Sequence, residues 1–148
     1  MSEVISMIYE ELQTKHGDIV GFESADCTGW YHIEDKMYSG IKAVLEKHSI
    51  SRKLFHLEQE KEKFGELRTY WDWSIDKESD DYTDSLLKAA YSEIQAVISA
   101  AATESANTCY LCGNSATVQS KGWILPYCQA CAEKQSDYPA AFRPSRPI

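Results

Sequence analysis

Four cysteines near the C-terminus constrain the fold of this chain more than any other feature of its sequence. They form two Cys-x-x-Cys pairs, Cys109 with Cys112 and Cys128 with Cys131, and fifteen residues separate the pairs. Each pair can present two thiolates from one tight turn, and a spacer of this length brings the second pair opposite the first. We therefore expect these four residues to bind one structural Zn²⁺.

Two other uses of the cysteines were weighed against structural zinc. Disulfides need an oxidising compartment, but residues 1–13 carry acids where a secretion signal would carry Lys or Arg. A catalytic zinc keeps an open coordination position and usually has His or carboxylate ligands, whereas four thiolates close the shell. Both comparisons favour a closed structural site.

The segment around the cysteines predicts a compact module. Gly113 follows the second thiolate, at a position that commonly adopts a left-handed conformation so that backbone N–H groups point at the sulfurs. Residues 115–119 and 122–127 read as a small hairpin, and residues 128–137 read as a helix that opens at the second pair. A knuckle, a hairpin and a helix in this order are typical of a treble-clef zinc ribbon.

Upstream of the module, the hydrophobic pattern predicts an N-terminal body of helices and one hairpin. Apolar residues recur at helical spacing from Val4 to Leu12, before Gly17, and again from Trp30 to His48, with Asp26 or Thr28 as the cap. Residues 53–73 alternate like a β-hairpin that turns at residues 61–65, KEKFG. A helix of about 25 residues, with its apolar face between Leu86 and Ala101, should then lead into the zinc module.

These elements predict an α+β fold with three parts. Residues 1–106 form the body, residues 107–138 form the four-cysteine zinc module, and residues 139–148 form a Pro-rich tail. We expect the tail to be disordered or to lie against a partner. No apolar run approaches the roughly 18 residues that span a bilayer, so a cytoplasmic protein is expected, without a membrane partner.

Charge is distributed unevenly along the chain. The net charge is −8, with −10 on residues 1–108 and +2 on residues 109–148. An acidic body disfavours non-specific binding to a phosphate backbone, which depends on Lys and Arg. Direct nucleic-acid binding is therefore the alternative function, and only the zinc end offers basic residues for it: Lys121, Lys134, Arg143 and Arg146.

Acidic side chains crowd the stretch between the hairpin and the long helix. They are Asp72, Asp76, Glu78, Asp80, Asp81 and Asp84. They are either a solvated loop with acids near a helix N-terminus or a surface that steers a basic partner. Trp71 and Trp73 share one face of the preceding strand, where they are either core or, if exposed, anchors of an interface.

Catalytic motifs are weak. The histidines at 16, 32, 48 and 56 show no spacing typical of a nucleophile and base pair, and each reads as a surface or core residue. Cys27 reads as a small buried hydrophobe. An enzyme with its site around His32, His56 or the acidic stretch remains the third hypothesis.

Three sequence blocks, GWYHIEDKM, EKFGELRTYW and CYLCG through GWILPYCQACA, occur in this order. With them the chain resembles small uncharacterised phage and prophage proteins that join a KFG-x-LR-x-Y block to a C-terminal cysteine block. The resemblance implies a phage origin and no specific activity. The tryptophan-rich segment 69–73 departs from that pattern.

The leading expectation is a non-enzymatic, zinc-stabilised binding protein that occupies a bacterial host protein. Its acidity suits a partner that normally binds nucleic acid, and a defence system such as CRISPR or restriction is the candidate target. A homodimer is also possible on this sequence.

Overall fold

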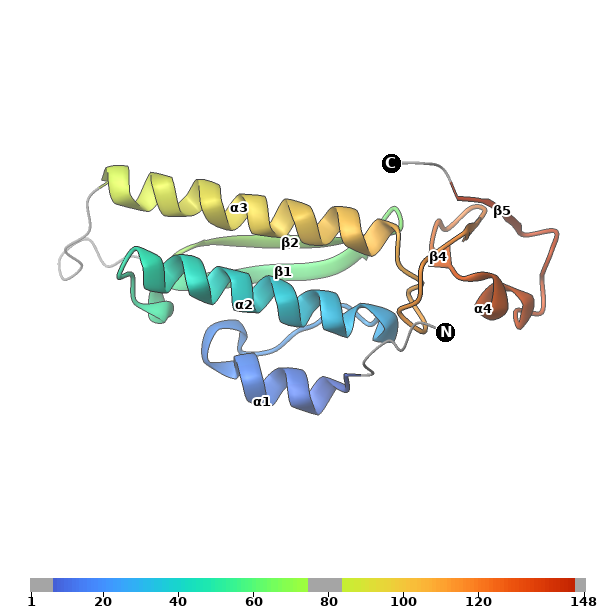
Figure 1. Ribbon diagram of the computed structural model, residues 1–148, viewed down its shortest axis with the longest axis horizontal. Coiled ribbons are helices and arrows are strands. Elements are labelled where there is room, and N and C mark those ends of the chain that lie inside the picture. Colours follow the sequence, from blue (N-terminus) through green and yellow to red (C-terminus); the bar gives the residue numbers. More distant parts are fainter. Residues whose placement is uncertain (1–6, 75–83, 146–148) are drawn as a thin grey trace.

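The computed structural model describes residues 7–74 and 84–145 of the 148. Helices and a hairpin form an elongated body, and a small sheet that carries the four cysteines closes one end (Figure 1). The expected α+β class is therefore confirmed. The elements are α1 (Tyr9–Val20), α2 (Tyr31–Lys47), β1 (Phe55–Lys63), β2 (Glu66–Trp73), α3 (Asp84–Ala106), β3 (Val118–Ser120), β4 (Pro126–Tyr127), α4 (Gln129–Glu133) and β5 (Phe142–Pro144).

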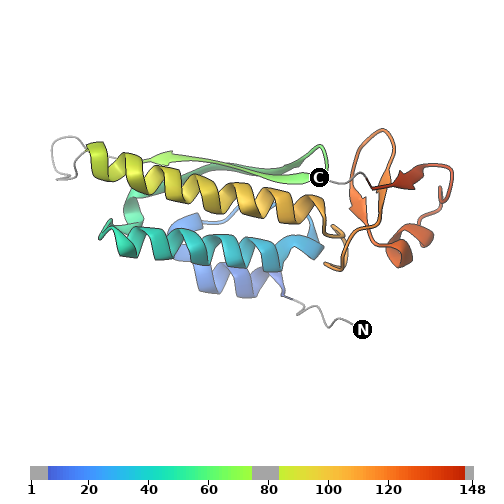
Figure 2. The ribbon, with the colours of Figure 1, turned by 45° about the horizontal axis from the view of Figure 1, so that its top comes forward.

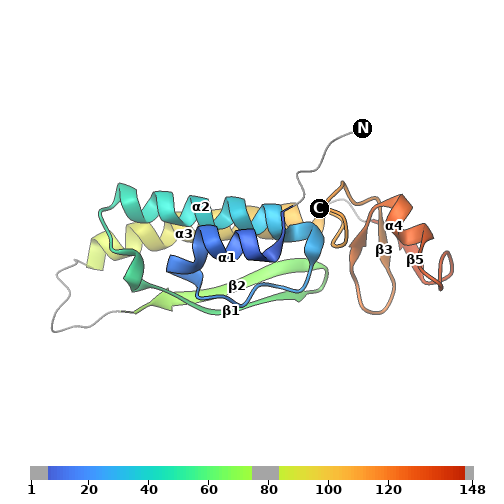
Figure 3. The same ribbon diagram turned by 90° about the horizontal axis from the view of Figure 1, so that it is seen from below.

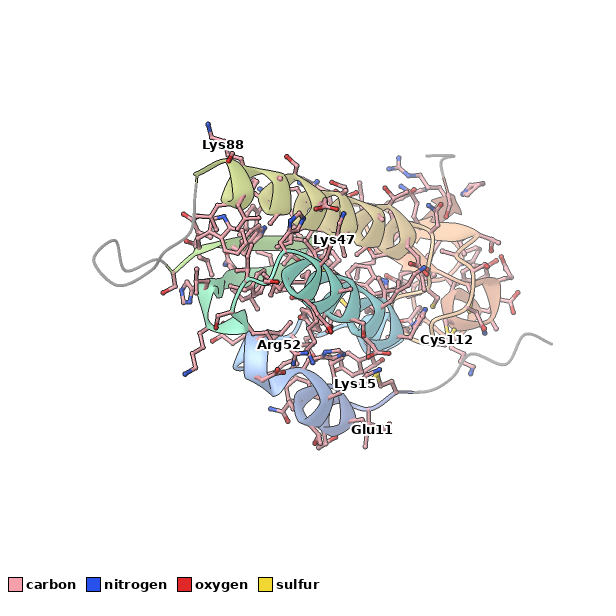
Figure 4. All side chains as sticks on the ribbon, turned by 60° about the vertical axis from the view of Figure 1, so that its left-hand side comes forward. Glu11, Lys15, Lys47, Arg52, Lys88 and Cys112 are labelled. Atoms are coloured by element: carbon pink, nitrogen blue, oxygen red, sulfur yellow. The ribbon has the colours of Figure 1, made fainter. Side chains whose placement is uncertain are left out.

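The body has a layered arrangement. Helices α2 and α3 run side by side along the β1–β2 hairpin, and α1 lies against α2 and β1 (Figures 1 and 3). Lys15, on the side of α1 that faces α2, forms an ion pair of 2.9 Å with Asp35 (Figure 4). The hairpin turn, the end of α3 and the start of α2 all lie toward the cysteine-bearing sheet (Figure 2).

The α2–α3 interface follows from the apolar stripes that predicted the two helices. A Cβ atom added at Gly40 would lie 2.9 Å from Cγ1 of Val97, so the absence of a side chain lets the two backbones approach closely. The buried residues on the two stripes are Ile33, Met37, Ile41 and Leu45 of α2, and Leu87, Ala90, Ile94, Ile98 and Ala101 of α3.

The hairpin turns in two residues, at the end of the segment predicted to turn. Phe64 has φ 53° and Gly65 has φ 81°, and positive φ at both central residues is the condition for a type I′ turn. Strand β1 therefore continues through Lys63. A bulge between Leu57 and Gln59 changes which side chains face inward, so that Glu60 is buried while Gln59 is exposed.

Two details of the predicted helices are wrong. The first helix runs through Gly17 to Val20 and is capped by Gly21, because its buried face continues to Ile19. Val4 and Ile5 lie outside the described residues. Neither Asp26 nor Thr28 caps α2, since a 3₁₀ turn, Thr28–Trp30, precedes it. The third predicted helix is confirmed as α3, and its last residue is followed almost directly by Cys109.

None of the helices within residues 7–74 and 84–145 is both long enough and apolar enough to cross a membrane.

Candidate metal centre

The four cysteines of the motif come together in one cluster. Their Sγ atoms all lie within 4.8 Å of one another, and those of Cys112 and Cys128 are 3.5 Å apart. Tetrahedral coordination with Zn–S bonds of about 2.3 Å places sulfurs about 3.8 Å apart, so the donor set and its size both fit one Zn²⁺. Cys109 is fully buried, whereas Cys112 is exposed at the end of the molecule that carries the module (Figure 4).

A backbone knuckle presents the first pair. The Gly113 N–H donates to the Cys109 carbonyl at 3.0 Å, and the Cys109 N–H donates to the Asn114 carbonyl at 2.7 Å. Gly113 has φ 84°, which confirms the left-handed conformation predicted for it. The turn also points the Asn114 backbone N–H at the Cys112 thiol, where it favours the thiolate.

The second pair lies at the start of α4. Cys128 caps the helix, and its Sγ accepts a hydrogen bond of 3.4 Å from the Cys131 N–H. Helix α4 is confirmed at the second pair, but it spans only Gln129–Glu133 rather than continuing to residue 137.

The thiols differ in how easily they ionise. Burial raises the pKa of the Cys112 and Cys131 thiols. Burial also acts to raise the pKa of Cys128, but the Cys131 backbone N–H and the neighbouring thiols outweigh it and hold that pKa below its ordinary value. Zinc binds thiolates, so metal binding here must displace protons and must weaken as the pH falls.

The predicted tail contributes a strand to the module. Strand β5 pairs with β3, which also pairs with β4, and Phe142 of β5 is 8% exposed. The Phe142 ring packs against those of Tyr127, at 4.9 Å between centroids, and Tyr138, at 5.6 Å. Up to residue 145 the tail thus packs on its own module, because these rings bury one another, so the expected disorder is wrong for this part of the tail.

The module is fastened to the body around the start of α2. The Trp30 indole N–H donates to the Thr108 carbonyl at 3.0 Å, and the Thr28 hydroxyl donates to the Leu111 carbonyl at 2.8 Å. The Gly29 N–H donates to the Tyr110 carbonyl at 2.8 Å, and a Cβ at Gly29 would lie only 2.1 Å from the Cys109 carbonyl oxygen. The knuckle that presents the first cysteine pair therefore packs directly on this segment of the body.

A second contact joins the module to the hairpin turn. The Trp123 indole N–H donates to Oε1 of Glu62 at 2.7 Å, and Oε2 of Glu62 accepts from the Gly65 N–H at 2.9 Å. One carboxylate therefore holds both the body's turn and the module's loop.

Only part of the sequence-predicted partner set lies within the described residues. Asp76, Glu78, Asp80 and Asp81 lie outside the described residues, Asp84 begins α3, and Asp72 is exposed on β2. Trp71 is 6% exposed and its ring is stacked on Phe55, with 5.0 Å between centroids. Of the two alternatives for Trp71, it is therefore a core residue. Trp73 packs edge-on against Trp71 and is half-buried.

Two of the four basic residues predicted at the C-terminal end are engaged within the module. Nζ of Lys121 donates to the Ala140 carbonyl at 3.0 Å, and Nε and Nη2 of Arg143 each donate to the Gln119 side-chain oxygen at 3.0 Å. Lys134 is exposed, and Arg146 lies outside the described residues.

The surroundings of the four histidines and of Cys27 are those of ordinary core and surface residues. His16 is buried and bonded to Asp35 at 2.7 Å, and His48 is paired with Glu93. His32 is half-buried and His56 is exposed. Cys27 is buried as expected, and burial raises its pKa to about 12.

Two features of the structure were missed from the sequence. One is a pair of exposed rings, Phe64 and Trp123, for which the KEKFG turn and the Gly-Trp step in the loop were available signals. The other is the buried carboxyl pair Glu34 and Glu60. It had no sequence signal, because a bulge turns Glu60 inward.

Comparison with known proteins does not assign the chain to a family. No family model matches the chain, and neither a curated protein nor a solved structure matches it significantly.

Proposed function

We propose that this chain is a zinc-stabilised, non-enzymatic binding protein that acts by occupying another protein. The observation that carries the proposal is the exposure of Phe64 and Trp123, at 72% and 74%, where the hairpin turn meets the zinc module. They border a cavity of about 390 Å³ that is lined by residues 61–64 and 122–124. Large aromatic side chains beside a pocket are typical of the residues that dominate protein interfaces.

The positions of Phe64 and Trp123 suit binding to a partner better than they suit stabilising the fold. The indole of Trp123 is fixed by its bond to Glu62, so little side-chain entropy remains to be lost on binding. Phe64 occupies the first central position of a type I′ turn, where Asn, Asp or Gly is favoured and an aromatic residue is not. Phe64 therefore raises the free energy of the turn and buries little surface, so contact with a partner explains its presence better than stability does.

The resemblance to phage proteins supports a bacterial host protein as the first class of partner to test. A component of a defence system, CRISPR or restriction, is the candidate. Zinc has a structural part in this proposal, since it holds the loop that carries Trp123 against the hairpin turn.

Affinity capture from a bacterial lysate tests the proposal, with the native chain compared with Phe64→Asn and Trp123→Ala. Both variants should remain folded, and Phe64→Asn should be more stable than the native chain because Asn suits the turn. Ile8→Ala is the matched control, since Ile8 is also a large exposed apolar residue, at 51%.

The expected result is a protein partner that survives nuclease treatment, is retained by Ile8→Ala and is lost with both aromatic variants. Capture that is unchanged in both aromatic variants would contradict the proposal. Recovery of nucleic acid alone, with binding that falls steeply with salt, would instead support the nucleic-acid alternative.

A further inference from the structure

A second pocket, of about 540 Å³, lies where α1, the loop after it and strand β1 meet. Its lining residues are Tyr9, Phe22, Glu23, Ser24, Ala25, Asp26, Tyr31 and Glu60. Three of these are aromatic and three are acidic, and no described residue that lines it is basic. It shares no lining residue with the cavity beside Phe64 and Trp123.

The aromatic residues form a continuous wall. The Tyr9 ring lies edge-on to Phe22, with 5.7 Å between centroids, and 6.1 Å from the Tyr31 ring. The Tyr9 hydroxyl donates to the Phe22 carbonyl at 3.5 Å, which ties α1 to the loop. The faces of such rings carry negative potential and attract ammonium and guanidinium groups.

Glu60 supplies a buried acid to the same pocket. Its side chain is 7% exposed, and one carboxyl oxygen, Oε2, accepts a hydrogen bond from the Tyr38 hydroxyl. The other oxygen, Oε1, is buried without a hydrogen-bond partner in the described part of the chain. A buried carboxyl oxygen without a hydrogen bond destabilises the fold, and it can accept a strong hydrogen bond from a ligand in the pocket.

Glu34, on α2, adds a second buried acid next to Glu60. It is fully buried, and within residues 7–74 and 84–145 neither of its carboxyl oxygens has a hydrogen bond of normal geometry. Burial and the neighbouring Glu60 raise its pKa well above the ordinary value, and Ser24 and the Ala25 backbone offset only part of this effect.

Among the described residues, the titratable groups that interact most strongly with this pair and its neighbours are neutral or acidic. They are Tyr9, Asp26, Cys27, Tyr31 and Tyr38. These two adjoining carboxyl groups have each other, rather than a described cation, as partners, so a bound cation would supply the positive charge that protons otherwise supply.

We propose that this pocket binds an organic cation, with an ammonium or guanidinium group against Glu60 and its carbon chain along the rings of Tyr9, Phe22 and Tyr31. An adjoining cavity of about 370 Å³ shares Phe22, Glu23 and Glu60 and continues along β1 past Glu58 to His56. The pocket therefore has room for the chain of a diamine or for a lysine or arginine side chain. The rings distinguish this site from one for a hard metal cation such as Ca²⁺ or Mg²⁺, which is coordinated by oxygen ligands.

The test is an NMR titration of the folded, zinc-loaded chain at pH 8. The probes are 1,5-diaminopentane, tetramethylammonium and the acetylated, amidated forms of lysine and arginine, with 1-pentanol as the neutral counterpart. At least one cation should give saturable shifts at Tyr9, Phe22 and Tyr31, and pentanol should bind at least about tenfold more weakly.

Glu60→Gln keeps the shape of the side chain and should weaken cation binding about tenfold or more, as expected for the loss of a charge-assisted hydrogen bond. Glu46→Gln, an exposed site on α2, makes the same change in net charge and should leave affinity within about twofold. Tyr9→Leu should weaken binding about threefold through the lost ring, and it is the second test if Glu60→Gln does not fold.

Preference for the diamine would identify a free polyamine as the source of the cation, and preference for the blocked amino acids would identify the side chain of a partner protein. Either preference supports the proposal. It is overturned if no cation gives saturable shifts at the three rings, if Glu60→Gln binds as tightly as the native chain, or if pentanol matches the cations.

Discussion

Gly29 touches the backbone of Cys109 so closely that it joins the body to the zinc knuckle. A side chain at this position would place its Cβ 2.1 Å from the Cys109 carbonyl oxygen and 2.6 Å from the Gly113 nitrogen. Both of those atoms belong to the turn that presents the first pair of thiolates. The geometry of the metal site is therefore coupled to the start of α2.

Gly29→Ala should destabilise the chain and weaken zinc binding together, because the knuckle backbone must move away from the added methyl group. We expect a loss of about 1–3 kcal/mol of unfolding free energy, as for overpacking elsewhere. Urea unfolding and competition with a zinc chelator measure the two effects.

Gly17→Ala is the matched control for this change. Apart from its chain neighbours and the backbone of its own helix, nothing lies within 4 Å of a Cβ at Gly17, which is in the interior of α1, so this variant should be more stable by about 0.5–1 kcal/mol. A Gly29→Ala chain with native zinc affinity would show that the contact does not shape the site.

Cys112→Ser should abolish zinc binding and unfold the C-terminal module, because a four-thiolate site contributes its binding free energy to folding. The measurements are zinc content, expected to fall from one ion per chain, and the NMR dispersion of residues 107–145. Cys27→Ser should retain its zinc, since Cys27 lies outside the cluster. A folded Cys112→Ser variant with bound zinc would rule out the structural assignment.

Trp30→Phe should cost about 2–3 kcal/mol, since it leaves a cavity in the core and removes the partner of the Thr108 carbonyl. Zinc release to a chelator should become faster as the knuckle loosens. Trp123→Phe, which loses a hydrogen bond at an exposed site, should cost about 1 kcal/mol or less, by urea unfolding. Equal losses in the two variants would contradict the coupling of the core to the knuckle.

Glu60→Gln should change how stability depends on pH. Burial raises the pKa of Glu60 from 4.5 to about 7, so the native state holds a proton that the unfolded chain releases between these values. Stability should then fall as the pH rises through this window, by up to about 3 kcal/mol, and the raised pKa of Glu34 extends the fall to higher pH.

Gln cannot ionise, so the variant should lose the part of this dependence that Glu60 contributes, keep the part due to the buried Glu34, and be more stable than the native chain at pH 8. Urea unfolding at pH 5, 6, 7 and 8 measures the slopes, with Glu46→Gln as the control that should retain the native slope. A native-like slope in Glu60→Gln would show that Glu60 does not carry the proton.

The sequence was sufficient for features whose cause lies within a few residues. Two Cys-x-x-Cys pairs at the right separation predicted the cluster, and Gly113 predicted the shape of the knuckle. The stripes of α2 and α3 predicted which helix faces are buried, because the helical repeat alone sets which residues share a face. For α1 the same reasoning failed at Gly17, since the burial of Ile19 outweighs the cost of a glycine within the helix.

The tertiary structure alone decided the positions of the side chains proposed here to bind partners. One bulge in β1 turns Glu60 rather than Gln59 into the core, and no local pattern specifies a bulge. The contact of Gly29 with Cys109 and the pairing of β5 with β3 join residues far apart in the sequence. Local spacing determined the four-cysteine cluster and most of the helices and strands of this protein, whereas long-range packing decided which of its polar and aromatic groups are buried, paired or exposed.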